Sequence, residues 1–159
     1  MHILLRPSTP QDQEFLFQLY ASTRREEVSA WGWNQEQQDA FLRMQFDAQQ
    51  RWYQAAYEGA EHRIVECEAG LIGRIMVLRG KDCNVLVDIA LLKEHRGRGI
   101  GGRLIRDLLE QSDKDGVAVQ LRVLKTNRAR WLYERLGFVQ TGEDDLYLHM
   151  ERTPGQGRL

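Results

Sequence analysis

A glycine-rich loop between an apolar strand and an amphipathic helix is the feature that most constrains this chain. The apolar run Val85–Leu92 leads into a loop whose residues are Arg96, Gly97, Arg98, Gly99, Ile100, Gly101 and Gly102. A strand, a glycine-rich turn and a helix in this order direct several backbone N–H groups at an anion. Glycine permits positive φ and a close approach of the ligand, and the two arginines add charge that suits phosphate oxygens. The segment therefore predicts a diphosphate site.

The charge of the chain limits the class of ligand that this loop can serve. The 159 residues carry a net charge of −1, with 42% hydrophobic and 28% charged residues, as expected for one globular domain. Between Lys93 and Arg106, five basic residues stand against the single acid Glu94. This local charge suits a small phosphorylated ligand better than a nucleic acid, which requires a broad basic face. We expect no nucleic-acid partner.

Three further features of the sequence limit the function. Cysteine positions indicate the redox compartment, histidine positions indicate whether a metal site is expected, and the length of the apolar runs indicates whether a membrane span is expected. Cys67 and Cys83 form neither a CxxC pair nor a disulfide framework, which favours reduced thiols in the cytoplasm. The four histidines lie far apart in the sequence, so we expect no metal site. A secretion signal is not expected, because MHILLRPSTP has no long apolar core. No apolar run approaches the ~20 residues of a membrane span. We expect a cytoplasmic protein with no membrane partner, and a homodimer is left open.

Periodicity and turn residues predict an alternation of strands and helices over residues 1–152, which we interpret as a single domain. We expect strands at residues 2–6, 63–67, 71–78, 85–92, 117–124, 138–141 and 146–150. Helices are expected from Pro10 through residue 20 with Thr9 as the cap, from Asn34 to about residue 57, from the glycine loop to residue 115, and from residue 126 or 127 to residue 136. The order β-α-α-β-β-β-α-β-α-β-β is typical of an α/β (α+β) fold. Residues 153–159, with one proline and two glycines, are expected to form a disordered tail.

Two common nucleotide-binding patterns can be compared with the loop. A P-loop requires GxxxxGKS or GxxxxGKT, and no lysine followed by Ser or Thr comes directly after these glycines, so a P-loop is excluded. Gly97, Gly99 and Gly102 match the GxGxxG of dinucleotide-binding folds, but Arg122 stands where an acidic ribose partner is expected. That arginine would suit a 2′-phosphate, although too few residues follow Gly102 to complete a doubly wound sheet. An NADP-type binder therefore stays an alternative.

The loop and a second motif together resemble the GNAT superfamily of N-acetyltransferases. The pattern Arg96-x-x-Gly99-x-Gly101 after an apolar strand is similar to the acyl-CoA-binding motif of that family. Further along, Asn127 begins the segment NRARWLYERLGF, which is similar to the second hallmark of the family. The resemblance covers about Val85–Phe138. It implies a GNAT-like mixed, mostly antiparallel central sheet of about seven strands, flanked by about four helices.

The resemblance also implies where acetyl-CoA (coenzyme A) binds. In the family, the strand before the loop splays from its neighbour, and the pantothenate arm pairs with its backbone, here at Ile89, Ala90 and Leu91. The diphosphate is expected over the loop, on the backbone N–H groups of Arg96–Gly102. Asn127 matches a family residue that bonds the cofactor arm. It lies six positions before Tyr133, where seven is common in the family.

The same resemblance implies a catalytic role for Tyr133, which matches the family tyrosine that donates a proton to the departing sulfur. Acetyl transfer to an amine requires a neutral amine, a stabilised oxyanion and a protonated leaving thiolate. Strand N–H groups near Ile89–Leu91 could serve the oxyanion. The general base is left open, because Arg122 stands where some relatives have a glutamate. Alternation along the strand turns Asp88 away from the face that meets the acceptor in relatives, which favours a structural ion pair with an arginine.

The acceptor is expected near the second helix, where Phe46, Gln49 and Tyr53 can share one face. An amphipathic packing helix would produce the same pattern. We expect an N-acetyltransferase that moves an acetyl group from acetyl-CoA to a primary amine of a small molecule or peptide by direct attack in a ternary complex. A non-catalytic acyl-CoA-binding regulatory module is the alternative, since such a module would keep Arg96–Gly102 but need not keep Tyr133.

Overall fold

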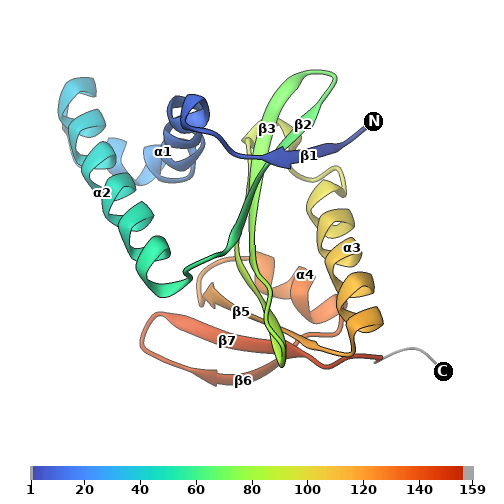
Figure 1. Cartoon of the computed structure of the whole chain (residues 1–159). Helices are drawn as coiled ribbons and strands as arrows, with labels where there is room; N and C mark the ends of the chain where they lie inside the picture. The colour runs from blue at the N-terminus through green and yellow to red at the C-terminus, as the bar shows by residue number, and fades with distance from the viewer. Residues whose placement is uncertain (1, 156–159) are drawn as a thin grey trace. The chain divides into compact units, whose positions relative to one another are not determined.

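Within the part of the chain that the structure describes, seven strands and four α-helices follow one another in the order expected from the sequence (Figure 1). The computed structural model describes residues 2–155. The strands are β1 (Leu4–Pro7), β2 (Glu61–Cys67), β3 (Gly70–Leu78), β4 (Cys83–Leu91), β5 (Ala118–Leu124), β6 (Val139–Glu143) and β7 (Tyr147–Arg152). The α-helices are α1 (Gln13–Ser29), α2 (Gln35–Ala56), α3 (Ile100–Asp115) and α4 (Ala129–Arg135), with short 3₁₀ turns at Pro10–Asp12 and Lys93–His95. The predicted α/β class is confirmed.

The strands form one sheet in the order β1-β2-β3-β4-β5-β7-β6. β4 and β5 run parallel, whereas β1 with β2, β5 with β7, and β6 with β7 are antiparallel. The register of β4 with β5 runs from the pair Cys83 and Ala118 to the pair Leu86 and Leu121. Both strands continue beyond the last of these pairs, β4 as far as Leu91 and β5 as far as Leu124. Pairing with β5 is therefore confined to the first half of β4.

The residues group into two compact units, and β3 and β4 contribute to both. The first unit runs to Met76 and includes Ile89–Arg96, whereas the second comprises Val77–Asp88 and the chain from Gly97 onward. A single domain over residues 1–152 stays a prediction. In the first unit, α1 and α2 lie side by side (Figure 1). Their shared core, closed by one β2 residue, comprises Leu16, Phe17, Ala21, Val28, Leu42, Phe46 and Ile64.

α2 begins at the residue expected from the sequence, whereas α1 does not. The segment expected to begin the first helix, Pro10–Asp12, is a 3₁₀ turn, and α1 begins at Gln13 and runs to Ser29, beyond the expected end at residue 20. Asn34 caps α2 by accepting the N–H of Gln37 at 2.8 Å, and the side chain of Gln37 accepts the N–H of Asn34 in return. Before α1, the carboxylate of Asp12 accepts the N–H of Thr9 at 2.8 Å and two N–H groups of Arg6 at 2.8 and 2.9 Å. These bonds hold the pKa of Asp12 well below its usual range, the guanidinium of Arg6 being the largest cause.

In the second unit, α3 packs the predicted apolar stripe against β5. The buried residues of the helix include Ile100, Leu104, Ile105, Leu108 and Leu109. The helix ends at Gly116, whose φ of +70° is the left-handed conformation typical of a glycine C-cap. Further along, α4 starts later than predicted, with Arg128 at the N-cap position. Asn127 still contributes, because its Oδ1 accepts the N–H of Ala129 at 2.9 Å.

The C-terminal strand is held to α3 by a buried ion pair. Arg152 donates from Nη1 to Oδ1 of Asp113 at 2.7 Å and from Nη2 to Oδ2 at 3.2 Å. Gly155, within the predicted tail, donates its N–H to the same Oδ1 at 3.0 Å. The rest of the predicted tail, residues 156–159, lies outside the described residues. Across residues 2–155, every helix is too short or too polar to cross a membrane.

Candidate active site

The glycine loop enters α3 through two glycines in the left-handed region. Gly97 has φ +74°, and Gly99, the N-cap residue of α3, has φ +81°. Residues with a Cβ rarely adopt this conformation, so these two glycines are explained by the backbone alone. The first helical hydrogen bond runs from the N–H of Arg103 to the carbonyl of Gly99 at 3.0 Å. The N–H groups of residues 100–102 therefore precede the intrahelical ladder and are available, with the positive end of the helix dipole, to an anion.

Gly101 has a different explanation from Gly97 and Gly99. It lies within α3 without a positive φ, and a Cβ placed on it would meet no heavy atom within 4 Å. Glycine in a helix costs about 0.5–1 kcal/mol relative to alanine, so neither the backbone nor internal packing favours it here. At Gly102, by contrast, a Cβ would lie 3.7 Å from Leu132 and 3.4 Å from Nη1 of Arg106. The open space at Gly101 fits a ligand that approaches the first turn closely.

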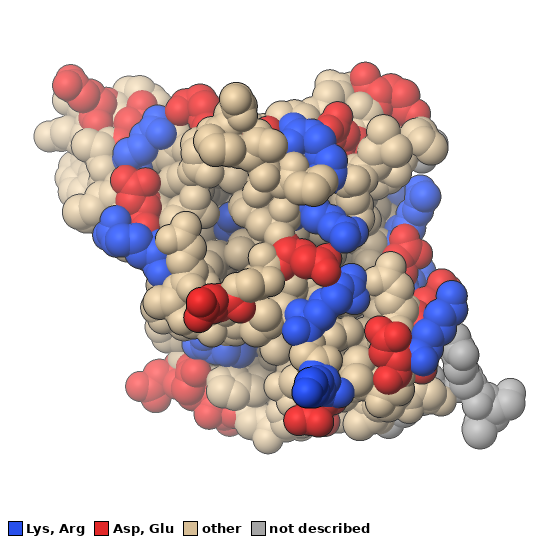
Figure 2. Space-filling view, in the orientation of Figure 1, with Lys and Arg blue, Asp and Glu red and all other residues tan. Residues whose placement is uncertain are grey.

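The charged side chains of the loop are exposed, and one of them also has a structural role. Arg96 donates from Nε to the carbonyl of Leu91 at 2.9 Å, which ties the loop to the last residue of β4. Arg98 is exposed. On the face shown in Figure 2, Lys and Arg side chains are interspersed with Asp and Glu.

The residues of β4 predicted to meet the cofactor, Ile89, Ala90 and Leu91, are half-buried. Gly73 of β3 allows this part of β4 to approach closely. A Cβ on Gly73 would overlap the carbonyl of Ala90 and lie 2.7 Å from Cδ2 of Leu91. A glycine inside an apolar strand pattern signals such an approach, and the sequence interpretation above did not use it.

Tyr133 lies on α4 with only 7% of its surface exposed. Its ring meets the edge of Phe138 with centroids 5.7 Å apart. Burial, together with the negative charge of Asp88, raises the pKa of the Tyr133 hydroxyl to about 12. Asp88 therefore acts on the residue predicted to be catalytic, a coupling between β4 and α4 that the sequence pattern did not reveal. At neutral pH the Tyr133 hydroxyl keeps its proton.

Arg122 stands at the position where some relatives have a glutamate. It is an exposed residue of β5, the strand that pairs with β7. It pairs with His149 in the strand register, its guanidinium lies 4.2 Å from the ring centroid of Tyr147, and Nη2 is 3.6 Å from Oδ2 of Asp144. The carboxylate of Asp144 accepts the N–H groups of Tyr147 and Leu146, and these bonds lower its pKa to about 2. Arg122 is thus paired with an ionised carboxylate.

The three α2 residues predicted near the acceptor lie in different surroundings. Phe46 is 2% exposed and packs its ring against Phe17 in the core. Core packing therefore accounts for an aromatic residue at this position, and no ligand contact is needed. Gln49 accepts a hydrogen bond from Nη2 of Arg74 at 3.2 Å. The guanidinium of Arg74, a buried residue of β3, lies 5.6 Å from the ring centroid of Tyr53. Only Gln49 and Tyr53 therefore have polar or ring contacts relevant to a site, and Arg74 joins them.

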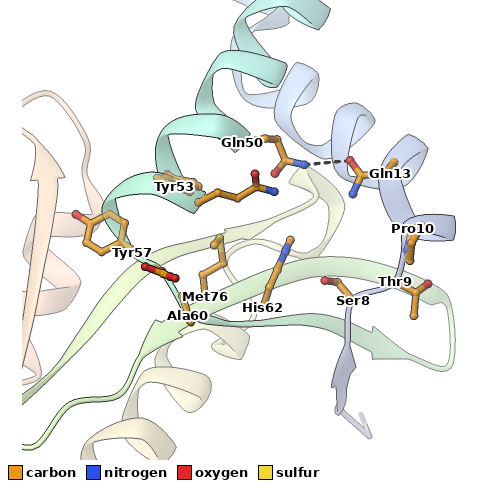
Figure 3. Close-up of a pocket in the computed structure, with 13 residues that line it drawn as sticks. Ser8, Thr9, Pro10, Gln13, Gln50, Tyr53, Tyr57, Ala60, His62 and Met76 are labelled. Atoms are coloured by element: carbon orange, nitrogen blue, oxygen red, sulfur yellow. Dashed lines mark hydrogen bonds between the residues drawn. The ribbon is translucent and has the colours of Figure 1, made fainter.

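A cavity of about 740 Å³ opens in the first unit beside Tyr53, and we call it the polar cavity. Figure 3 shows it between α2, the segment before α1, and strands β2 and β3. At one side Gln50 donates to Gln13 at 3.0 Å. The lining residues are Ser8, Thr9, Pro10, Gln13, Gln50, Tyr53, Gln54, Tyr57, Glu58, Gly59, Ala60, His62 and Met76. Across residues 2–155, no group of three or more His, Cys, Asp or Glu side chains is placed to hold a metal ion.

The family model for the acetyltransferase (GNAT) domain matches residues 58–140, just over half of the chain. No curated protein matches the sequence. The matched region runs from the end of α2 to the start of β6 and contains the glycine loop and α4.

Solved structures share the fold at low sequence identity. PaiA N-acetyltransferase from Thermoplasma acidophilum, in complex with coenzyme A, is 19% identical with a TM-score of 0.70, covering 96% of this chain and 99% of that chain. The histone acetyltransferase HPA2 and related acetyltransferase from Corynebacterium glutamicum is 21% identical with a TM-score of 0.68, covering 100% of both chains. A ribosomal-protein-alanine N-acetyltransferase from Escherichia coli is 17% identical with a TM-score of 0.63, covering 99% of both. Family match and fold agree, and the chain belongs to the GNAT family of acetyltransferases, whose acyl donor is acetyl-CoA.

Proposed function

We propose that this protein is an N-acetyltransferase that transfers the acetyl group of acetyl-CoA to the primary amine of a small molecule or peptide by direct attack in a ternary complex. The observation that carries the proposal is the start of α3. Three backbone N–H groups there precede the helical ladder, and Gly101 leaves open space beside them. This combination fits the diphosphate of coenzyme A.

The proposed contacts with coenzyme A divide between the loop and β4. The N–H groups of Gly97–Gly102 and the side chain of Arg98 hold the diphosphate. The backbone of Ile89–Leu91 pairs with the pantothenate arm, since the register of β4 with β5 ends at Leu86. Asn127 contributes its amide N–H groups to the arm, because its Oδ1 already accepts the N–H of Ala129.

Bound acetyl-CoA supplies an acetyl group activated as a thioester. Backbone N–H groups of Ile89–Leu91 orient its carbonyl and stabilise negative charge on the oxygen. Tyr133 holds a proton at Oη for the departing sulfur. With a pKa of about 12, it is a weaker acid than a thiol of pKa about 8.5 by about 3.5 pK units, or about 5 kcal/mol. Complete proton transfer is therefore unfavourable, and a hydrogen bond from Tyr133 to the sulfur is the contribution that its acidity permits.

A cytoplasmic location belongs to the same proposal. Cys67 and Cys83 are both free thiols, which suits a reducing compartment.

Calorimetry with coenzyme A, followed by thiol release from acetyl-CoA in the presence of a panel of primary amines, tests the proposal. We expect coenzyme A to bind and at least one amine to accelerate thiol release. Acetyl-CoA should raise the melting temperature, whereas NADPH should not. A protein that takes up neither coenzyme A nor acetyl-CoA would refute the proposed function. Binding without acetyl transfer to any amine would instead favour a regulatory module.

A further inference from the structure

Helix α2 packs one face on the first unit and leaves the opposite face exposed. Leu42 and Phe46 lie in the shared core, and Gln49 accepts a hydrogen bond from Arg74 of β3. A second set of residues, at the same helical spacing, turns away from that core. These exposed residues, which we call the outer face, are Ala40, Met44, Asp47, Ala48, Arg51 and Ala55.

The outer face carries apolar side chains where a surface helix usually carries polar ones. Met44 is 59% exposed, and Trp52, at the edge of this face, is 48% exposed. The four-residue spacing from Met44 through Ala48 to Trp52 places the three side chains in one row along the helix. Single exposed apolar residues are common on protein surfaces, but a row of them on the side away from the core is typical of a helix with a second partner.

The two charged residues of the outer face, Asp47 and Arg51, have opposite signs. Asp39 and Arg43, which flank the packed face of the same helix, pair with charged residues of α1 at 2.7 and 3.2 Å. Within residues 2–155, Asp47 and Arg51 take part in no ion pair, and they do not pair with each other although they lie one turn apart. Both charges are therefore available to a partner.

The order of these charges makes the outer face complementary to a second copy of itself. When two identical helices pack antiparallel about a two-fold axis, each residue before the axis faces the residue equally far beyond it on the partner. With the axis at Gln49, Asp47 faces the partner's Arg51, and Arg51 faces the partner's Asp47. Opposite charges then meet twice across the axis, whereas a parallel pair would place like charges opposite each other.

The apolar residues match about nearly the same axis. With the axis at Gln50, Ala48 faces the partner's Trp52, and with the axis between Gln49 and Gln50, Met44 faces the partner's Ala55. Each large side chain thus meets a small one, which allows the two helices to approach closely and their side chains to interdigitate. Charge and shape therefore select the same crossing point.

We propose that the outer face of α2 is the interface of a homodimer, in which the two α2 helices pack antiparallel about a two-fold axis near Gln49. Met44 and Trp52 are then withdrawn from water, and Asp47 and Arg51 pair across the axis. The helix has 22 residues and is about 33 Å long. One pair of helices of this length forms an interface at the small end of the range for specific complexes, so we expect a dissociation constant of roughly 1–100 μM. The dimer does not depend on the proposed acetyltransferase function.

Sedimentation equilibrium over protein concentrations that span this dissociation constant tests the proposal. We expect the wild type to pass from monomer to dimer as its concentration rises. Asp47→Arg and Arg51→Asp each place like charges across the axis, so each variant alone should dimerise at least about tenfold more weakly. In an equimolar mixture of the two variants, one copy carries two arginines at these positions and the other two aspartates. The mixture should therefore form heterodimers with a dissociation constant within about threefold of the wild-type value.

Two further variants control for net charge and for packing. Glu26→Arg, at an exposed position in the last turn of α1, changes the net charge by as much as Asp47→Arg and should leave dimerisation unchanged. Met44→Glu should weaken dimerisation at least about tenfold and, because Met44 is exposed, should leave the melting temperature of the monomer nearly unchanged.

Three results would each overturn the proposal: a wild type that stays monomeric throughout, charge variants that dimerise as well as the wild type, or a mixture of the two charge variants that stays monomeric. Calorimetry with coenzyme A on the same proteins separates the two proposals. A monomeric wild type that binds coenzyme A would remove the interface and leave the proposed function standing.

Discussion

The substitution Gly101→Ala separates what the loop does for the fold from what it does for a ligand. A methyl group at this position meets no heavy atom within 4 Å, and the residue is helical without a positive φ. The free protein should therefore gain about 0.5–1 kcal/mol from the better helix former. For a protein of this size, that gain corresponds to a rise of about 1–4 °C in melting temperature. Differential scanning calorimetry of the free protein measures it.

The same methyl group occupies the space proposed for the diphosphate. We expect the affinity for coenzyme A to fall by at least about tenfold, or about 1.4 kcal/mol, by isothermal titration calorimetry. Gly99→Ala is the contrasting control, because its φ of +81° should make the substitution destabilise the free protein by about 1–2 kcal/mol. A Gly101→Ala protein that melts higher and binds coenzyme A as tightly as the wild type would refute the assignment of this space to the ligand. A lower melting temperature would refute the helix argument instead.

Three further substitutions have defined outcomes. Tyr133→Phe should lower turnover at least about tenfold while coenzyme A affinity stays nearly unchanged, since only the hydrogen bond from the hydroxyl to the departing sulfur is lost; unaltered turnover would remove Tyr133 from the mechanism. Asp12→Asn should cost about 2 kcal/mol near pH 7 in urea unfolding. Because folding lowers the pKa of Asp12, this difference is complete above about pH 4 and shrinks as the pH falls through the folded-state pKa, so a constant difference down to pH 2 would contradict the assignment. Gly73→Ala should destabilise by about 2 kcal/mol because a Cβ there overlaps β4. Gly142→Ala, where a Cβ meets nothing within 4 Å, should shift the melting temperature little, and equal shifts for the two would count against the close approach of β3 to β4.

Local signals in the sequence predicted element types and ends well where one residue decides the geometry. Asn34 caps α2, and Gly116 ends α3 in the left-handed conformation, as their chemistry requires. The start of α4 was predicted one or two residues early. Asn127 bonds the N–H of Ala129 from outside the helix, and side-chain chemistry alone does not distinguish that turn from a cap.

The sequence pattern did not predict features that depend on contacts between residues far apart in the chain. Phe46 shares its helical face with Gln49 and Tyr53, but periodicity does not say which part of a face meets the core. The end of the β4 register at Leu86 and the effect of Asp88 on Tyr133 both require strands and helices from separate parts of the chain. The polar cavity is of the same kind, since its lining comes from four segments of the first unit.

The bond from Arg96 to the carbonyl of Leu91 has a consequence for how substitutions at this position should be interpreted. Lysine would preserve the positive charge. It has no planar guanidinium that can donate from Nε to a strand carbonyl and still offer its Nη groups to another partner. Arg96→Lys would then remove the hydrogen bond that joins the loop to the end of β4. A substitution that keeps the charge would therefore still change how the loop is held.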